Sequence, residues 1–303
     1  MMKRVVLLIV VLAVIILGFQ IWAKIYPEWL WFKSDSINLP SVFLTILKTK
    51  LGLGIGSGLV FLVLTLGNLF IIWRLSLRST EIDTIPVGER RFEVGRKLIM
   101  GGLILICVFF SFIAALGAAG QWEPYLRFAN SDQLSFSVVD PQYYKDPIFK
   151  NDIAYYVFKM PFLRFTRGWF FLTFLFITLG TGLIYSLFSR SSPERHRMGF
   201  QLPLRIHLFI LCAITLLLLA WGRIFAMYEL LAPATRHGWV YGVGYTDAAA
   251  RIPVYKLMMY VAILSAVLFI VSIFVRRATW LAIGGVGLFV LVAFLGGAAY
   301  PLS

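Results

Sequence analysis

Three aspartates recur at intervals of six residues, at Asp140, Asp146 and Asp152. Carboxylates gathered in one loop can bind calcium, although calcium loops usually have closer ligand spacing and a glycine at the bend. Asp140 and Asp146 each precede a proline, and Asp-Pro is also typical of an N-cap followed by proline at the first helical position. We therefore expect these aspartates to cap the backbone, with a cation site or contact with a partner as the alternatives.

A second set of ionisable residues surrounds the end of one apolar stretch. Arg223 and Glu229 flank that end, and Asp247 lies in a glycine-rich segment beyond it. Ionisable side chains within a membrane often mark an ion or solute pathway. Arg223 is close enough to the end of its stretch to extend its charge toward the membrane surface. The pattern therefore favours pairing and anchoring, with a solute or proton path as the alternative.

No residue pattern typical of catalysis or of a metal centre is found in the sequence. Cys107 and Cys212 both lie in apolar stretches, without neighbours that could act as metal ligands or as a catalytic base. The three histidines, His196, His207 and His237, complete no Ser/His/Asp or Cys/His set. We expect no enzymatic activity, no cofactor and no metal.

The elements that must position these residues are apolar runs long enough to cross a bilayer. The hydrocarbon core is about 30 Å thick, and a spanning helix needs about 20 mostly apolar residues. The composition agrees, with 60% hydrophobic and only 14% charged residues. We predict an all-α membrane protein, a bundle of seven transmembrane helices with structured extracytoplasmic loops. The predicted spans are residues 5–23, 53–73, 98–119, 169–188, 204–223, 254–275 and 280–299.

The density of Lys and Arg predicts the orientation, because cytoplasmic loops carry an excess of both. If the N-terminus is cytoplasmic, the short inner segments hold half of the 28 basic residues. We therefore predict a multi-pass cell-membrane protein with a cytoplasmic N-terminus and an extracytoplasmic C-terminus. The net charge of +14 then reflects orientation and contact with anionic lipid headgroups. Nucleic acid is not expected as a partner, because no basic stripe interleaved with aromatic residues is found.

The outer segment of residues 120–168 is too long for a structureless connection in a compact domain. Leu134, Phe136 and Val138 alternate as in a short strand. Residues 154–170 are apolar and aromatic, with interrupting cations, which favours an interfacial amphipathic helix that leads into the fourth span. We expect these parts to form a small folded cap on the outer face.

Small residues inside the runs predict where helices pack. Gly54-x-x-x-Gly58 and Ala293-x-x-x-Gly297 would let two helix backbones approach closely, which favours association in lipid. Two polar residues of the second run are expected to hydrogen-bond to a neighbouring helix: Thr65 and Asn68.

Several stretches along the chain together resemble uncharacterised protein family 0182, a group of large prokaryotic membrane proteins. These stretches include Trp29-Leu30-Trp31-Phe32-Lys33, Asp140-Pro141, Asp152-Ile153-Ala154-Tyr155-Tyr156, Tyr228-Glu229-Leu230-Leu231 and Tyr245-Thr246-Asp247. The resemblance implies about seven N-terminal spans followed by a large extracytoplasmic domain, and Ser303 lies about where that domain would begin. The family offers no established catalytic residues that could be transferred to this chain.

We expect an integral membrane protein that anchors or assembles an extracytoplasmic domain or complex through the outer segments 120–168 and 224–253. A transporter or channel for a charged solute is the alternative. A membrane enzyme acting on lipid or envelope precursors is a weaker alternative, because the sequence shows no nucleophile paired with a catalytic base. The expected partners are anionic lipid headgroups at the inner loops and, on the outer side, a protein or a covalent C-terminal domain.

Overall fold

The computed structural model of the chain describes residues 2–34, 36–77, 85–87, 90–92, 96–133, 145–189, 202–231, 243–275 and 278–299. Nearly all of these residues are helical, as expected for a chain whose backbone groups must be satisfied within lipid. Turns and loops connect the helices, and two short strands are also described. These strands are β1 (Ile85–Val87) and β2 (Arg90–Phe92), which pair antiparallel as a hairpin with Pro86 opposite Arg91.

Long helices make up most of the described chain. They are α1 (Met2–Lys33), α2 (Pro40–Ile72), α3 (Arg96–Ala119), α5 (Met160–Ser189), α7 (Leu202–Glu229), α8 (Ile252–Val271) and α9 (Ala278–Ala299). Every predicted span falls within a helix or its direct continuation, apart from residues 272–275, which follow α8. The predicted helical fold is therefore confirmed.

Five stretches of the described residues are long and apolar enough to cross a membrane. They are Pro40–Leu75, Lys97–Ala119, Tyr155–Leu187, Leu202–Glu229 and Asp247–Val271. A further apolar stretch, Thr279–Phe294, is shorter. These helices indicate a membrane protein, which confirms that part of the prediction.

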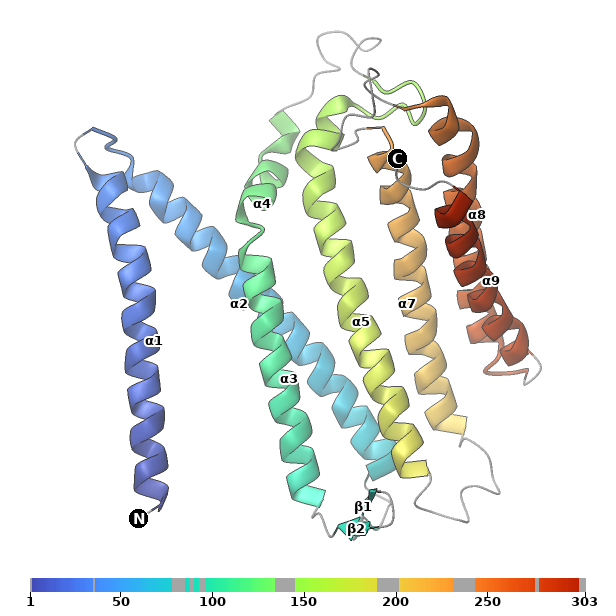
Figure 1. Cartoon of the computed structure of the whole chain (residues 1–303), viewed down its shortest axis with the longest axis horizontal. Coiled ribbons are helices and arrows are strands. Elements are labelled where there is room, and N and C mark those ends of the chain that lie inside the picture. The colour runs from blue at the N-terminus through green and yellow to red at the C-terminus, as the bar shows by residue number, and fades with distance from the viewer. Residues whose placement is uncertain are drawn as a thin grey trace.

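Figure 1 shows α3, α5, α7, α8 and α9 running roughly along one direction, with α2 crossing obliquely and α1 standing apart. The N-terminal end of α1, the hairpin and the start of α7 lie at one end of the molecule, which we call the hairpin end (Figure 1). The short helix α4 (Trp122–Ala129) and the start of α5 lie at the opposite end, which we call the α4 end. At about 1.5 Å per residue, the 33-residue α2 is about 50 Å long and exceeds the hydrocarbon thickness, which fits its oblique course.

Small residues bring α2 and α3 into close contact. A Cβ atom on Gly58 would lie 3.0 Å from Ala115 Cβ, and one on Gly54 would lie 3.4 Å from Ala119 Cβ. Ser111 Oγ donates a hydrogen bond to the Gly58 carbonyl at 2.7 Å. The predicted packing role of Gly54-x-x-x-Gly58 is confirmed, because the two backbones approach where neither helix carries a large side chain.

The close helix contact predicted for Ala293 in α9 is not made with another helix of the described residues, because Ala293 is exposed. The contact with α8 is made instead by Ala282, Gly285 and Phe289, with Gly285 directly against the Ser265 side chain. A small residue permits close packing only on the face that meets a neighbour, and a spacing of four does not say which face that is.

Polar side chains link helices within the bundle. Asn68 Nδ2 on α2 donates a hydrogen bond to Thr181 Oγ1 on α5 at 3.0 Å, which confirms the expected interhelical contact. Thr65 Oγ1 donates to the Phe61 carbonyl of its own helix at 2.9 Å. Toward the hairpin end, the Tyr185 hydroxyl and His207 Nδ1 lie 2.8 Å apart and join α5 to α7.

Residues 154–170 do not form a separate interfacial helix. A π-helical turn, η3 (Tyr155–Lys159), continues directly into α5. The cations that suggested an interface find partners on other elements, so this segment can continue along the α5 axis. Lys159 pairs with Asp132, and Arg164 pairs with Glu229. The predicted strand at residues 134–138 lies outside the described residues.

Candidate functional site

The loop that precedes α5 is built around one buried carboxylate, that of Asp146, which is 8% exposed. Asp146 Oδ1 accepts hydrogen bonds from the backbone N–H of Ile148 at 2.8 Å and of Phe149 at 2.6 Å. Asp146 Oδ2 accepts one from the backbone N–H of Asn151 at 2.8 Å and one from the Tyr156 hydroxyl at 2.8 Å. Both oxygens are therefore occupied by donors of the loop and of the helix that follows.

The electrostatics of Asp146 follow from this arrangement. Burial by itself would raise the pKa of Asp146, because the charged carboxylate loses water. Three backbone N–H groups and one hydroxyl stabilise the charged form more than burial disfavours it, so the pKa of Asp146 lies below its usual value. Asp146 is thus a carboxylate at neutral pH, and its charge holds the loop together.

Asp152 begins the helical segment that leads into α5. Its Oδ1 accepts a hydrogen bond from the backbone N–H of Ala154 at 2.8 Å, and its backbone pairs with that of Lys145 in an isolated bridge. Asp152 thus caps the backbone at the start of a helical segment, as expected. Asp146 caps a turn instead, since no helix begins at the proline that follows it, and Asp140 lies outside the described residues. Within the described ranges, no three His, Cys, Asp or Glu side chains are grouped so that they could hold a metal ion.

An aromatic cluster attaches this loop to the end of α7. The ring of Tyr228 lies 5.0 Å from that of Phe149, 5.8 Å from that of Tyr155 and 5.6 Å from that of Tyr156, measured between centroids. All three contacts are edge-to-face, the arrangement that aromatic quadrupoles favour. We call Asp146 together with these four aromatic residues the Asp146 junction.

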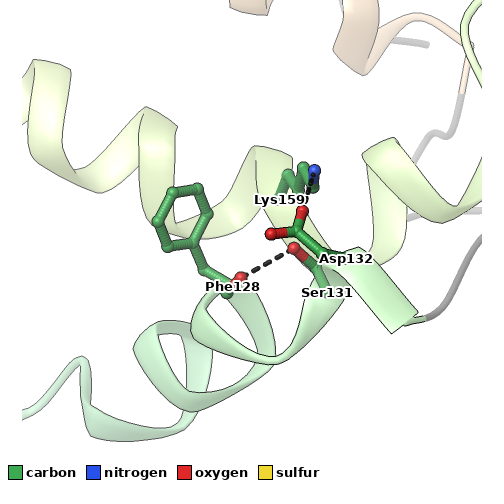
Figure 2. Close-up of polar contacts among 4 residues, drawn as sticks. All are labelled: Phe128, Ser131, Asp132 and Lys159. Atoms are coloured by element: carbon green, nitrogen blue, oxygen red, sulfur yellow. Dashed lines mark hydrogen bonds and ion pairs between the residues drawn. The ribbon is translucent and has the colours of Figure 1, made fainter.

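A second attachment joins α4 to the start of α5. Lys159 Nζ donates to Asp132 Oδ1 at 2.9 Å, and Ser131 Oγ donates to the Phe128 carbonyl at 2.7 Å (Figure 2). The hydrogen bond and charge of Lys159 lower the pKa of Asp132. The rings of Phe128 and Phe162 also pack, with centroids 5.2 Å apart. The end of α4 is thereby held against the α5 segment.

Glu229 and Asp247 are paired with cations other than Arg223. Glu229 forms an ion pair with Arg164 of α5. Asp247 Oδ1 accepts from Arg251 Nη1 at 3.0 Å within the π-helical turn η4 (Asp247–Arg251). Across the described parts of the chain, no hydrogen bond or ion pair joins Arg223 to either acid. The structure therefore does not bring these three sequence candidates together as one charged set.

Arg167 on α5 points at the backbone of α7. Its Nε donates to the Leu218 carbonyl at 2.8 Å and its Nη2 to the Leu219 carbonyl at 3.4 Å. The guanidinium lies directly against Gly222, where any Cβ atom would collide with it. Arg167 can therefore contact the surface of α7 because Gly222 has no side chain.

Arg223 lies next to Gly222 on α7 and faces α8 and α9. Its guanidinium carbon is 5.9 Å from the ring centroid of Tyr255 and 6.0 Å from that of Phe289. Arg223 Nε is buried and has no hydrogen-bond partner among the residues that the structure describes. Arg167 and Arg223 are also close enough to repel one another electrostatically.

An apolar cavity of about 500 Å³ lies between α2, α3 and α5. Aromatic residues dominate its wall, namely Phe61, Phe110, Phe165, Trp169 and Phe176. A smaller cavity of about 220 Å³ shares Phe176 and is lined by Asn68 and Thr181. The lining residues of both cavities include no charged side chain, so the two cavities suit an apolar chain better than a charged solute.

A family model matches almost the whole sequence. The model of the Uncharacterised protein family (UPF0182) covers residues 5–303. The chain belongs to this family. The resemblance seen in the sequence motifs is thereby confirmed, and the activity of UPF0182 proteins is uncharacterised.

UPF0182 relatives are much longer than this chain. A UPF0182 protein of Pelotomaculum thermopropionicum is 31% identical over 293 residues, which cover 93% of this chain and 30% of that protein. UPF0182 proteins of Streptomyces coelicolor and Mycobacterium tuberculosis are 28% and 29% identical, over 28% and 29% of their own lengths. The chain thus spans less than a third of these relatives. No solved structure matches it.

Two motif stretches that carried the resemblance to UPF0182 meet in the structure. Tyr155 and Tyr156 of one stretch contact Tyr228 of the other. Sequence reasoning identified Asp146 but missed this aromatic cluster, because its members are far apart in the chain. It also missed Arg167, which was considered only as one of the cations interrupting an apolar stretch.

Proposed function

We propose that this UPF0182 chain is a non-enzymatic membrane domain that anchors and assembles an extracytoplasmic domain or complex. The observation that carries the proposal is the Asp146 junction. A buried, fully hydrogen-bonded carboxylate and four packed aromatic rings give the α4 end a defined surface instead of a loose connection. A docking platform needs a surface of this kind, because ordering a loose loop upon binding costs affinity.

Exposed apolar side chains in the Asp146 loop and in the segment before η4 support a docking role. Ile148 and Ile153 are 40% and 41% exposed, and Tyr245, two residues before η4, is 88% exposed. These residues lie outside the long apolar helices or at their edge. Apolar groups grouped on a water-facing surface are typical of protein interaction sites. The lengths of the UPF0182 relatives also fit a domain that carries further chain or further subunits.

The proposed topology has seven crossings, with the N-terminus and the hairpin end cytoplasmic and the α4 end extracytoplasmic. The up-and-down course of the long helices in Figure 1 is compatible with it, and the basic residues of the inner segments favour it. In this arrangement the inner loops contact anionic lipid headgroups in the cell membrane.

Cysteine accessibility tests the topology in a background in which Cys107 and Cys212 are replaced by alanine. A membrane-impermeant maleimide should label Lys150→Cys in intact cells, and should label Arg91→Cys only after the membrane is permeabilised. Equal labelling of both positions in intact cells would refute the orientation. Reporters fused to the two chain ends should lie on opposite sides of the membrane.

Photo-crosslinking in cells tests the docking role. A photoreactive amino acid at Ile148 or Tyr245 should capture a protein or another part of the same polypeptide, identified by mass spectrometry. The matched control is Leu105, an exposed residue of α3 that should capture lipid only. A platform role is untenable if Ile148 and Tyr245 both behave like Leu105.

A further inference from the structure

Arg167 and Arg223 place two positive charges at one level of the helix bundle. Arg167 lies against Gly222, the residue that precedes Arg223, so the two guanidinium groups approach the same turn of α7. This turn lies six residues before the end of α7 at Glu229, which is about 9 Å along the helix. If a hydrocarbon core of about 30 Å is centred on the 28-residue α7, this turn lies near the boundary between headgroups and acyl chains in the leaflet at the α4 end.

Among the described residues, no ion pair joins Arg167 or Arg223 to a carboxylate. Four acids of the α4 end are paired with other cations: Glu123 with Arg127, Asp132 with Lys159, Glu229 with Arg164 and Asp247 with Arg251. The Asp146 carboxylate at the same end is occupied by backbone N–H groups of its loop and by the Tyr156 hydroxyl. A guanidinium retains its charge in every protein environment, so Arg167 and Arg223 cannot lose their repulsion by deprotonation. The position therefore carries an excess positive charge where water is scarce.

The hydrogen-bonding needs of Arg223 point to a missing acceptor. The faces of Tyr255 and Phe289 attract the cation, but a ring face is a poor substitute for an oxygen acceptor. Arg223 Nε is buried without a partner, and a buried donor that stays unsatisfied is costly. Arg167 differs, because the carbonyls of Leu218 and Leu219 already fix the orientation of its guanidinium.

We propose that Arg223, assisted by the charge of Arg167, binds the phosphodiester headgroup of an anionic phospholipid. Phosphate oxygens are the acceptors that a guanidinium fork fits best, and a phosphodiester carries the negative charge that the described residues lack here. A phospholipid is the phosphate source that this depth favours, because its headgroup lies at the level of Arg223 while its acyl chains lie along the apolar helices. The proposed lipid site is thus centred on the Gly222–Arg223 turn of α7, with Arg167 of α5 on one side and Tyr255 and Phe289 of α8 and α9 on the other.

Native mass spectrometry and thermal unfolding of the full chain in detergent test this site. Delipidated protein should bind short-chain phosphatidylglycerol with a rise in melting temperature. Arg223→Gln should weaken that binding about tenfold, as expected for the loss of one charge-assisted contact. Arg223→Lys should recover only part of it, because an ammonium lacks the fork. The control Arg127→Gln removes an exposed cation of the α4 end and should bind like the original protein.

Two further measurements on the unchanged protein keep the proposal falsifiable if Arg223→Gln does not fold. Diacylglycerol of the same chain length lacks the phosphate and should give no rise in melting temperature. Inorganic phosphate alone should give none at concentrations at which phosphatidylglycerol saturates. Equal stabilisation by diacylglycerol overturns the phosphate contact, and stabilisation by inorganic phosphate alone overturns the lipid assignment. Unchanged affinity in a folded Arg223→Gln protein overturns the role of Arg223.

Discussion

The Tyr156 hydroxyl donates a hydrogen bond to Asp146 Oδ2 at 2.8 Å, and this contact joins the loop before α5 to the helix that the loop leads into. The ring of the same tyrosine packs against Tyr228 at the end of α7. One side chain therefore couples a buried charge to an interhelical aromatic contact. The loop cannot loosen without disturbing α7, and the junction should behave as a single unit.

Asp146→Asn should loosen the whole junction. The carboxylate offers two acceptor oxygens, whereas the amide of asparagine offers one oxygen and an NH₂ group. The NH₂ group would face backbone N–H or hydroxyl donors that bind a carboxylate oxygen in the original protein, so these donors would lose their acceptor. Leaving buried donors unsatisfied should cost roughly 2 kcal/mol. Unfolding of the purified protein in mild detergent would measure this loss. Asp132→Asn is the control, because its ion pair is exposed and should contribute little. Equal effects of the two variants would contradict the central role of Asp146.

The Asp146 contribution should depend on pH with a definite sign. The pKa of Asp146 is lowered in the folded protein, so its stabilisation is fully present above the unfolded value of about 3.9. This stabilisation is lost as the pH falls from the unfolded value to the lowered pKa of the folded protein. In that range the unfolded state binds the proton more readily, so protonation favours unfolding. Melting temperatures of the original protein and of Asp146→Asn should therefore differ by a constant amount between about pH 5 and 8, and converge below about pH 4. A constant difference down to pH 2 would show that the carboxylate charge is not what stabilises the junction.

The apolar runs were enough to locate the long helices, because a segment in lipid must satisfy its own backbone hydrogen bonds. They did not locate the helix ends. The second predicted span begins at residue 53, whereas α2 begins at Pro40. The length of an apolar run reflects the part of a helix that lies in hydrocarbon. It does not reveal polar helical turns that extend beyond the membrane. Proline at the first helical position was the local signal for this start.

The candidate site was only partly predictable for a similar reason. The Asp-Pro motif signals backbone capping locally, and Asp146 makes such contacts. The ring contacts of Tyr228 join residues more than 70 positions apart in the chain, and no periodicity encodes such a pairing. The cations of residues 154–170 suggested an interface because their partners, Asp132 and Glu229, come from other elements.

Gly58→Val should separate α2 from α3. A Cβ atom at Gly58 would already lie 3.0 Å from Ala115 Cβ, so the branched side chain must push the helices apart and disturb the hydrogen bond from Ser111. We expect a loss of about 1–3 kcal/mol, as for other overpacked sites. The matched control is Gly56→Val on the same helix, where a Cβ atom meets nothing within 4 Å. Unfolding in mild detergent should distinguish the two variants, and equal stabilities would mean that the α2–α3 contact does not depend on the small residue.

Gly222→Ala should displace Arg167 from the surface of α7. The new methyl group would occupy the position of the guanidinium, so Arg167 must leave the carbonyls of Leu218 and Leu219. Losing a charged hydrogen bond costs about 1.5–3 kcal/mol, and the better helix propensity of alanine returns at most about 1 kcal/mol. The net effect should be a destabilisation of about 1 kcal/mol, measured by unfolding in mild detergent.

A double-mutant cycle separates this displacement from any general effect of alanine at position 222. If the cost of Gly222→Ala arises from displacing Arg167, it should disappear in an Arg167→Ala background, where no guanidinium remains to be displaced. Gly180→Ala on α5 is the control for adding a methyl group to a helix, because its Cβ atom would meet nothing within 4 Å. That control should be neutral or stabilising in both backgrounds. If Gly222→Ala destabilises the Arg167→Ala protein as much as the original protein, the added methyl group does not act by displacing Arg167. The contact between Arg167 and Gly222 would then be refuted as the cause.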